Sequence, residues 1–113
     1  MTISQVRPNR LDDWLAAHAG RNPLVLDVRE PLELQAASVK AQGFALVHIP
    51  MSQLTARLAE LDPARPVACL CHHGMRSQQV AMYLERNGFE DVANVAGGID
   101  AWSLERDPAI PRY

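Results

Sequence analysis

One short segment of the sequence combines a thiol, two imidazoles, a guanidinium and a hydroxyl: Cys71, His72, His73, Gly74, Met75, Arg76 and Ser77. A cysteine thiolate is a strong nucleophile, and Arg76 brings a cation that stays protonated at any physiological pH. The segment follows an apolar run and precedes a helical pattern, so its backbone N–H groups can converge where the helix dipole is positive. Gly74 permits the positive φ or close backbone approach that such a loop requires. These features favour a thiolate at Cys71 and predict an anion-binding loop around its sulfur.

The elements that would position this loop follow from alternating apolar runs and helical patterns. Five apolar runs predict short strands, at 3–6, 24–28, 45–49, 66–71 and 92–95. Helical spacing predicts helices after most of them, at 9–20, 52–61, 77–87 and from 99 onward, the last following a tight turn at Gly97 and Gly98. Such alternation predicts an α/β fold with a central parallel sheet of about five strands and helices on both faces. Ligands bind at the carboxyl ends of such strands, which is where Cys71, Asp27 and Arg29 are expected.

Capping signals refine three of these helices. The first is expected to begin after Asn9 and to stop at Gly20. The second should end before Pro63, and three leucines at helical spacing mark its apolar face: Leu54, Leu58 and Leu61. The third should end at Gly88 and bury three residues: Val80, Ala81 and Leu84.

The bulk composition predicts one ordinary domain covering residues 1–113. With 48% hydrophobic and 21% charged residues, the chain is close to the average for globular proteins. A formal net charge of -2 offers no general attraction to nucleic acid. No basic segment is followed by a long apolar run, so neither an export signal nor a membrane anchor is predicted. Cys69 and Cys71 are too close in sequence for a useful disulfide, which indicates a reducing, cytoplasmic compartment.

The reactive segment resembles the Cys-x-x-Gly-x-Arg-Ser active loop of rhodanese domains. Three further segments resemble, in the family's order, its Asp-Val-Arg strand end, its His-Ile turn and its Gly-Gly-x-x-Ala-Trp segment: 26–30, 48–50 and 95–102. Each match alone is weak, but four in order span nearly the whole chain. A departure occurs at Met51 and Ser52, where many rhodaneses have a Gly-Ala pair.

This resemblance implies a sulfurtransferase that works by double displacement through a persulfide on Cys71. The donor would be thiosulfate or another persulfide, and the acceptor cyanide, a small thiol or a protein thiol, with no cofactor or metal. The resemblance assigns binding of the persulfide to the loop residues: His72, His73, Gly74, Met75, Arg76 and Ser77. The resemblance implies that Asp27 and Arg29 support the loop. Two roles are open for Arg29, an ion pair with Glu30 or Glu33 or a contact with the bound anion, and the structural role is expected. The oligomeric state is not predicted.

Two other functions use related features. Cysteine phosphatases and arsenate reductases also place a thiolate in an anion-binding loop, but their loops hold five residues between cysteine and arginine, and this one holds four. The shorter loop predicts room for one extra sulfur rather than a tetrahedral oxyanion. Non-catalytic rhodanese-like binding modules typically lack the cysteine, which is present here.

The remaining polar residues near the loop have ordinary structural interpretations. Cys69 should face the same side as Cys71 and serve packing, with a resolving thiol as the alternative. A zinc site is disfavoured because Cys-x-Cys-His-His lacks the spacing of structural zinc ligands, and a thioredoxin-type reductase is disfavoured because Cys-x-x-Cys is missing. His72 and His73 are expected at the pocket rim, and His48 in a hydrogen-bonded turn.

Overall fold

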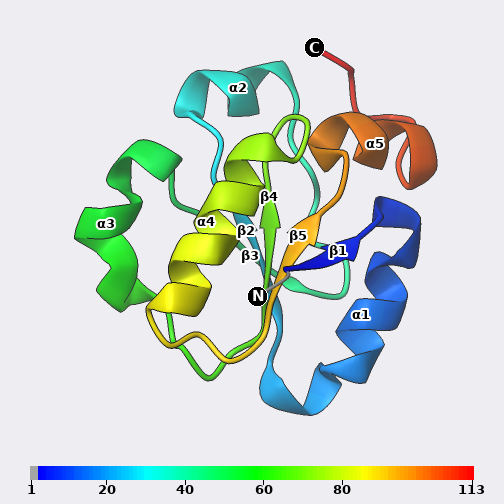
Figure 1. The fold of residues 1–113 in the computed structure, drawn as a ribbon. Coiled ribbons are helices and arrows are strands. Elements are labelled where there is room, and N and C mark those ends of the chain that lie inside the picture. Colours follow the sequence, from blue (N-terminus) through cyan, green and yellow to red (C-terminus); the bar gives the residue numbers. More distant parts are fainter. Residues whose placement is uncertain (1–2) are drawn as a thin grey trace.

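Five parallel strands form the centre of the computed structural model, which describes residues 3–113 (Figure 1). The sheet order is β1-β5-β4-β2-β3, and every neighbouring pair is parallel. The strands are β1 Ser4–Val6, β2 Leu24–Asp27, β3 Ala45–His48, β4 Val67–Leu70 and β5 Val92–Val95. The helices are α1 Leu11–Ala17, α2 Pro31–Ala36, α3 Leu54–Arg57, α4 Met75–Arg86 and α5 Gly98–Glu105. The predicted α/β class and the five-stranded parallel sheet are confirmed.

Of the three inner strands, β2 and β4 are buried along their whole length because helices cover both faces of the sheet. Alternate side chains enter opposite layers, as strand geometry requires. Leu26 and Cys69 pack with residues of α3 and α4, whereas Val25 and Ala68 pack with residues of α1 and α5. Figure 1 shows these two helix pairs on opposite sides of the sheet. Because β4 pairs with strands on both sides, the sheet fixes the position at which the reactive loop begins.

The helix that follows the reactive loop is close to its prediction. α4 begins at Met75, two residues earlier than expected, and buries the three predicted residues Val80, Ala81 and Leu84. Gly88 takes a φ of 87° just beyond the helix end, the left-handed conformation expected there. Twelve residues make α4 the longest helix of the described chain, and no helix there has the length and apolar character needed to cross a membrane.

The predicted ends of the first helix are wrong. Asn9 lies inside a 3₁₀ turn, Pro8–Arg10, and Arg10 occupies the position before α1. Pro8 explains this shift, since its fixed φ favours a helical start at that residue. The helix ends at Ala17, and the left-handed residue after it is Asn22, with a φ of 59°, rather than Gly20. Asparagine tolerates that conformation better than most residues.

The single helix predicted for 52–61 is also wrong. The chain forms a 3₁₀ turn at Met51–Gln53, the short α3, and a second 3₁₀ turn at Leu58–Glu60. Leu54 and Leu61 are nevertheless buried in the α3–α4 layer, and Leu58 packs against it. Apolar spacing reports which side chains are buried, and a series of short turns satisfies it as well as one continuous helix.

α2 was not predicted, although its sequence carries a start signal. Glu30 and Glu33 form a capping box, and Pro31 occupies the first turn. The helix has no buried residue, so it lacks the apolar periodicity by which helices are recognised.

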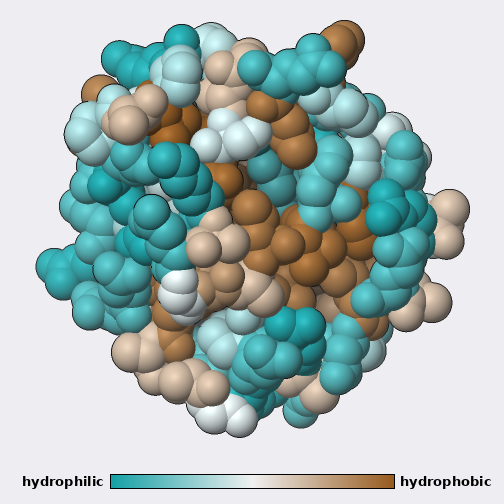
Figure 2. Space-filling model, turned by 180° about the vertical axis from the view of Figure 1, so that it is seen from behind, coloured by the Kyte–Doolittle hydropathy of each residue, from teal (hydrophilic) through white to brown (hydrophobic). Residues whose placement is uncertain are grey.

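Strand β3 is one edge of the sheet, and Leu46 and Val47 on it are half-buried. Figure 2 views the molecule from behind and shows apolar residues gathered in the middle of the visible face. The carboxyl ends of β4 and β2 lead into the loops that carry Cys71 and Arg29.

Candidate active site

The Cys71 sulfur is surrounded by hydrogen-bond donors of its own loop. It accepts the backbone N–H groups of Gly74, at 3.1 Å, and Ser77, at 3.3 Å. The Ser77 hydroxyl lies 3.2 Å from the same sulfur. Charged sulfur is stabilised by such converging donors at the start of a helix. Backbone N–H groups thus converge on the Cys71 sulfur as the sequence predicted, and they come from Gly74 and Ser77.

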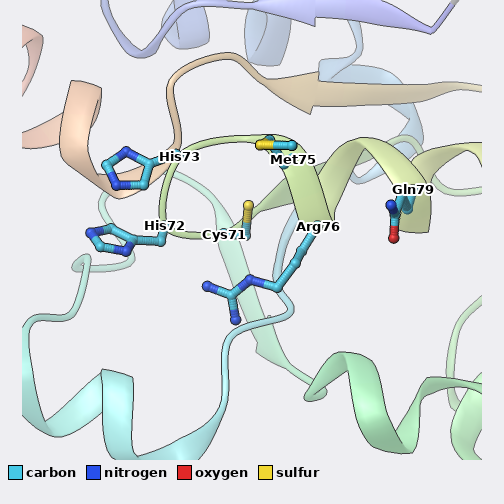
Figure 3. A pocket seen from close by; sticks show the side chains of 6 residues that line it. All are labelled: Cys71, His72, His73, Met75, Arg76 and Gln79. Atoms are coloured by element: carbon cyan, nitrogen blue, oxygen red, sulfur yellow. The ribbon is translucent and has the colours of Figure 1, made fainter.

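Cys71 is 1% exposed, yet it forms part of the wall of a cavity of about 380 Å³. The cavity is lined by Cys71, His72, His73, Met75, Arg76 and Gln79. Figure 3 shows the sulfur among these side chains, with the two histidine rings on one side and Gln79 on the other. A thiol at this place is shielded from bulk water but can be reached by a small molecule that enters the cavity. Gln79 was missed, although it follows Met75 by one helical turn.

The reactive loop is held in place by the start of α5. The carbonyl groups of Cys71 and His72 accept the N–H groups of Ile99, at 2.8 Å, and Asp100, at 3.2 Å. Gly98 has a φ of 61°, and a Cβ there would collide with the His72 carbonyl. The expected Gly97-Gly98 turn therefore has a specific use, because it lets the helix end approach the loop backbone.

A buried asparagine on β5 completes the loop's support. Asn94 is 3% exposed and donates from Nδ2 to the Gly74 carbonyl, at 3.1 Å. Its Oδ1 accepts the Ser77 hydroxyl, which has one proton to share between Asn94 and the Cys71 sulfur. Sequence reasoning missed Asn94. The available signal was a polar residue inside a strand expected to be buried, since such a group needs partners.

Arg76 forms a two-bond ion pair with Glu33 of α2. Its two terminal nitrogens each donate to one carboxylate oxygen at 2.7 Å. Glu33 also accepts the Glu30 N–H, at 2.9 Å, and the Tyr113 hydroxyl, at 3.0 Å. The hydrogen bonds from Arg76 are the main reason why the pKa of Glu33 falls from 4.5 to about 2, and the pair in turn raises the pKa of Arg76. The sequence predicted Arg76 as an anion contact and did not predict this partner.

Asp27 and Arg29 form a second ion pair that is fully buried. The Arg29 side chain is 0% exposed, and its Nη2 lies 2.8 Å from Asp27 Oδ2. The predicted ion pair of Arg29 with Glu30 or Glu33 is therefore wrong. The backbone carbonyl of Glu33 accepts a hydrogen bond from Arg29 Nη1, at 3.3 Å. Sequence proximity favoured the later glutamates, whereas the two-residue spacing at the strand end brings Asp27 into contact. His48 Nε2 lies 2.6 Å from the Arg29 carbonyl, as expected for a hydrogen-bonded turn residue.

His72 and His73 lie at the cavity wall as predicted, and their rings stack. Their centroids are 3.9 Å apart, and His72 stacks in turn on Tyr113 at 3.9 Å with an angle of 5° between the planes. His72 Nε2 lies 2.6 Å from the Tyr113 carbonyl. Within residues 3–113, no three histidine, cysteine or acidic side chains are grouped as metal ligands would be.

Cys69 lies in the same apolar layer as Cys71, as predicted, and is 0% exposed. Burial, with a smaller contribution from Cys71, raises the pKa of the Cys69 thiol far above its ordinary value. Cys69 is therefore a neutral packing residue at physiological pH.

The structure is thus an α/β protein with a parallel sheet, in which backbone amides of a strand-to-helix loop surround a cysteine sulfur. The chain belongs to the rhodanese family, because the model of the rhodanese-like domain matches residues 11–105. The family resemblance inferred from the sequence motifs is confirmed.

Two relatives and one solved structure are similar to this chain. The chain is 41% identical over 93 residues to the rhodanese-like/PpiC domain-containing protein 12, chloroplastic, of Arabidopsis thaliana, a match that covers 79% of this chain and 30% of the plant protein. It is 40% identical over 78 residues to the thiosulfate sulfurtransferase GlpE of Vibrio cholerae, covering 69% of this chain and 70% of the relative. The rhodanese-like domain protein from Staphylococcus aureus superposes with a TM-score of 0.76 at 25% identity, covering 98% of this chain and 99% of the other. This chain therefore spans less than a third of the plant relative's length.

Proposed function

We propose that this chain is a sulfurtransferase that carries a sulfane sulfur as a persulfide on Cys71. Family membership and the sulfurtransferase name of the Vibrio relative support sulfur transfer in general. One observation carries the proposal further: the Cys71 sulfur has three donors within 3.3 Å and lines a cavity. We also propose that residues 1–113 act as one rhodanese domain, since one sheet organises both apolar layers.

The reaction consists of two displacements at sulfur. In the first, the Cys71 thiolate attacks the outer sulfur of the donor, and the leaving group departs with the electron pair of the broken S–S bond. Thiosulfate would release sulfite, and a thiol persulfide would release a thiolate. In the second, cyanide or a thiolate attacks the terminal sulfur of the Cys71 persulfide, and the Cys71 thiolate leaves. Charge and electrons balance in each step, so no external oxidant or reductant is needed.

The loop stabilises the negative sulfur in each form of the enzyme. The amide groups of Gly74 and Ser77 are fixed before the reaction, so they need not reorganise as charge develops. The remaining loop residues His72, His73, Met75 and Arg76 would border the added sulfur and the donor. Asp27 and Arg29 would act through the backbone, since their buried pair braces the segment that follows β2.

The cysteine phosphatase alternative is less well supported. A phosphatase arginine must present two parallel N–H donors to the oxyanion, whereas the parallel pair formed by the two terminal nitrogens of Arg76 is directed at the Glu33 carboxylate. The loop also holds four residues between Cys71 and Arg76. Both observations favour a small sulfur adduct over a tetrahedral oxyanion.

Intact mass spectrometry tests the proposal directly. We expect one added sulfur after incubation with thiosulfate or with a thiol persulfide, and its removal by cyanide with formation of thiocyanate. Cys71→Ser should abolish the added sulfur, while the control Cys69→Ala retains it. If no donor adds sulfur to the folded wild-type protein, the chain is a non-catalytic module. Turnover of an aryl phosphate without thiocyanate formation would instead favour the phosphatase.

A further inference from the structure

The cavity in front of Cys71 has little net charge, although the proposed donors are anions. Of the six lining residues, all within the described chain, Arg76 alone has a permanent charge. Glu33 balances that charge through two hydrogen bonds of 2.7 Å. The wall therefore offers an incoming donor the partial charges of backbone amides, with no uncompensated cation.

Several hydrogen bonds hold Glu33 in its ion pair with Arg76. Glu33 is anchored on three sides, by Arg76, by the Glu30 N–H at 2.9 Å and by the Tyr113 hydroxyl at 3.0 Å. These bonds keep the carboxylate ionised, since the pKa of Glu33 is about 2. The side chains of Arg76 and Glu33 are 35% and 21% exposed, so solvent screens the pair only in part. A donor cannot gain the full attraction of the guanidinium without first separating it from Glu33.

The rest of the wall suits an organic group. Met75 supplies a thioether, and His72 and His73 supply stacked rings 3.9 Å apart. Such surfaces contribute by burying apolar atoms of a ligand. Thiosulfate has no apolar part to bury, whereas a donor of the form R–S–S⁻ or R–SO₂–S⁻ has one.

Charge count separates the two kinds of donor further. The attacking Cys71 thiolate is negative, so the repulsion at a given distance is twice as large for a dianion as for a monoanion. A guanidinium without a partner would attract the dianion more strongly and so offset the larger repulsion. Glu33 cancels this attraction by neutralising Arg76.

We propose that Glu33 sets the donor selectivity of the site: by neutralising Arg76, it makes the cavity favour singly charged sulfane-sulfur donors, the thiol persulfides and thiosulfonates, over dianionic thiosulfate. Glu33 is a positioning residue in this scheme because it acts through Arg76. The inference rests on the proposed function, since it needs Cys71 to accept the sulfur. The chemical step is unchanged: the Cys71 thiolate attacks the outer sulfur, and a thiolate or sulfinate leaves with the electron pair.

A matched pair of donors isolates the effect of charge. Thiosulfate and methanethiosulfonate both donate a sulfur bound to a sulfonyl sulfur, and they differ by one charged oxygen in place of a methyl group. With cyanide as acceptor, thiocyanate formation gives kcat/KM for each donor, which in a ping-pong mechanism reports the loading of Cys71 alone. The quantity to compare is the ratio of kcat/KM for methanethiosulfonate to that for thiosulfate.

Two variants should move this ratio in opposite directions. Glu33→Gln frees the charge of Arg76, and we expect the ratio to fall about tenfold, mainly through faster loading from thiosulfate. Arg76→Gln leaves the Glu33 carboxylate unbalanced, and we expect the ratio to rise. Glu60→Gln is the control, because Glu60 forms a similar two-bond pair with Arg57, at 2.8 and 3.0 Å, on the surface.

Mere damage to the loop would lower loading from both donors together and leave the ratio unchanged. An unchanged ratio in Glu33→Gln, or a shift of the same sign in both variants, would overturn the proposal. If Glu33→Gln does not fold, the direction of the change in Arg76→Gln decides. Failure of both donors to load the wild-type protein would instead refute the proposed function itself.

Discussion

Cys69 and Cys71 face the same apolar layer of the sheet, are 0% and 1% exposed, and differ in what surrounds their sulfur atoms. Cys69 lies inside β4, where its backbone pairs with the neighbouring strands. Cys71 lies just beyond the strand, where the amides of Gly74 and Ser77 are free to turn toward its sulfur. Equal burial therefore leaves the two sulfur atoms in different surroundings, and the loop that follows the strand supplies the difference.

Replacement of each cysteine tests the difference between the two thiols most strongly. We expect Cys71→Ser to lower sulfur transfer by at least about a thousandfold, because a hydroxyl cannot form the persulfide. Cys69→Ala should retain transfer while lowering the free energy of unfolding by about 1–2 kcal/mol through a small cavity. Thiocyanate formation and urea unfolding measure the two effects. Equal losses of activity in both variants would contradict a purely packing role for Cys69.

Alkylation compares the two thiols in one native protein. We expect iodoacetamide at neutral pH to modify Cys71 at least about a hundredfold faster than Cys69, whose thiol is buried and has a raised pKa. Peptide mapping after timed quenching gives the two rates. Cys69 should react at a comparable rate only in denaturant. Fast native modification of Cys69 would revive the resolving-thiol interpretation.

Removal of one hydrogen-bond donor tests how much the surroundings of the Cys71 sulfur contribute. We expect Ser77→Ala to lower kcat/KM for sulfur loading by about 10- to 100-fold, because one of three donors around the sulfur is lost. Ser103→Ala is a matched control, since Ser103 is also buried and its hydroxyl donates to the Ile110 carbonyl away from the cavity. If both serine variants lose activity equally, the loss reflects stability rather than stabilisation of the anion.

The smallest expected effect concerns the loop's anchor at Glu33. Because its folded pKa lies near 2, below the ordinary 4.5, ionised Glu33 stabilises the fold fully above about pH 4.5, and this contribution is lost as the pH falls toward 2. The wild type should therefore exceed Glu33→Gln by about 1–2 kcal/mol in free energy of unfolding at pH 7, with allowance for solvent screening. The difference should shrink on acidification. Urea unfolding between pH 3 and 7 measures it, and a constant gap would argue against the ion pair as its source.

Sequence predictions succeeded where the information is local. The run from Cys71 to Ser77 carries its own chemistry, since a thiol, a glycine and the first turn of a helix within a few residues are enough to build an anion cradle. The apolar runs at 24–28 and 66–71 identify inner strands, because no other element buries both faces in so few residues. The failures have two causes. At Asn9 and Gly20 other residues, Pro8 and Asn22, take the positions at the helix ends, and at 52–61 apolar spacing records burial, which several turn geometries provide equally well.

The class of fold, the five strands and the position of Cys71 in the loop after β4 were thus predicted from the sequence alone, through residue types, spacing and period. Tertiary structure alone decided the partners of the loop: Glu33 on Arg76, Asn94 on Ser77, and the α5 backbone on the Cys71 carbonyl. These contacts join residues between 17 and 43 positions apart, or depend on Gly98 allowing two backbones to meet. Only the packed sheet sets such distances, because no local propensity encodes which distant side chain will neutralise a given charge.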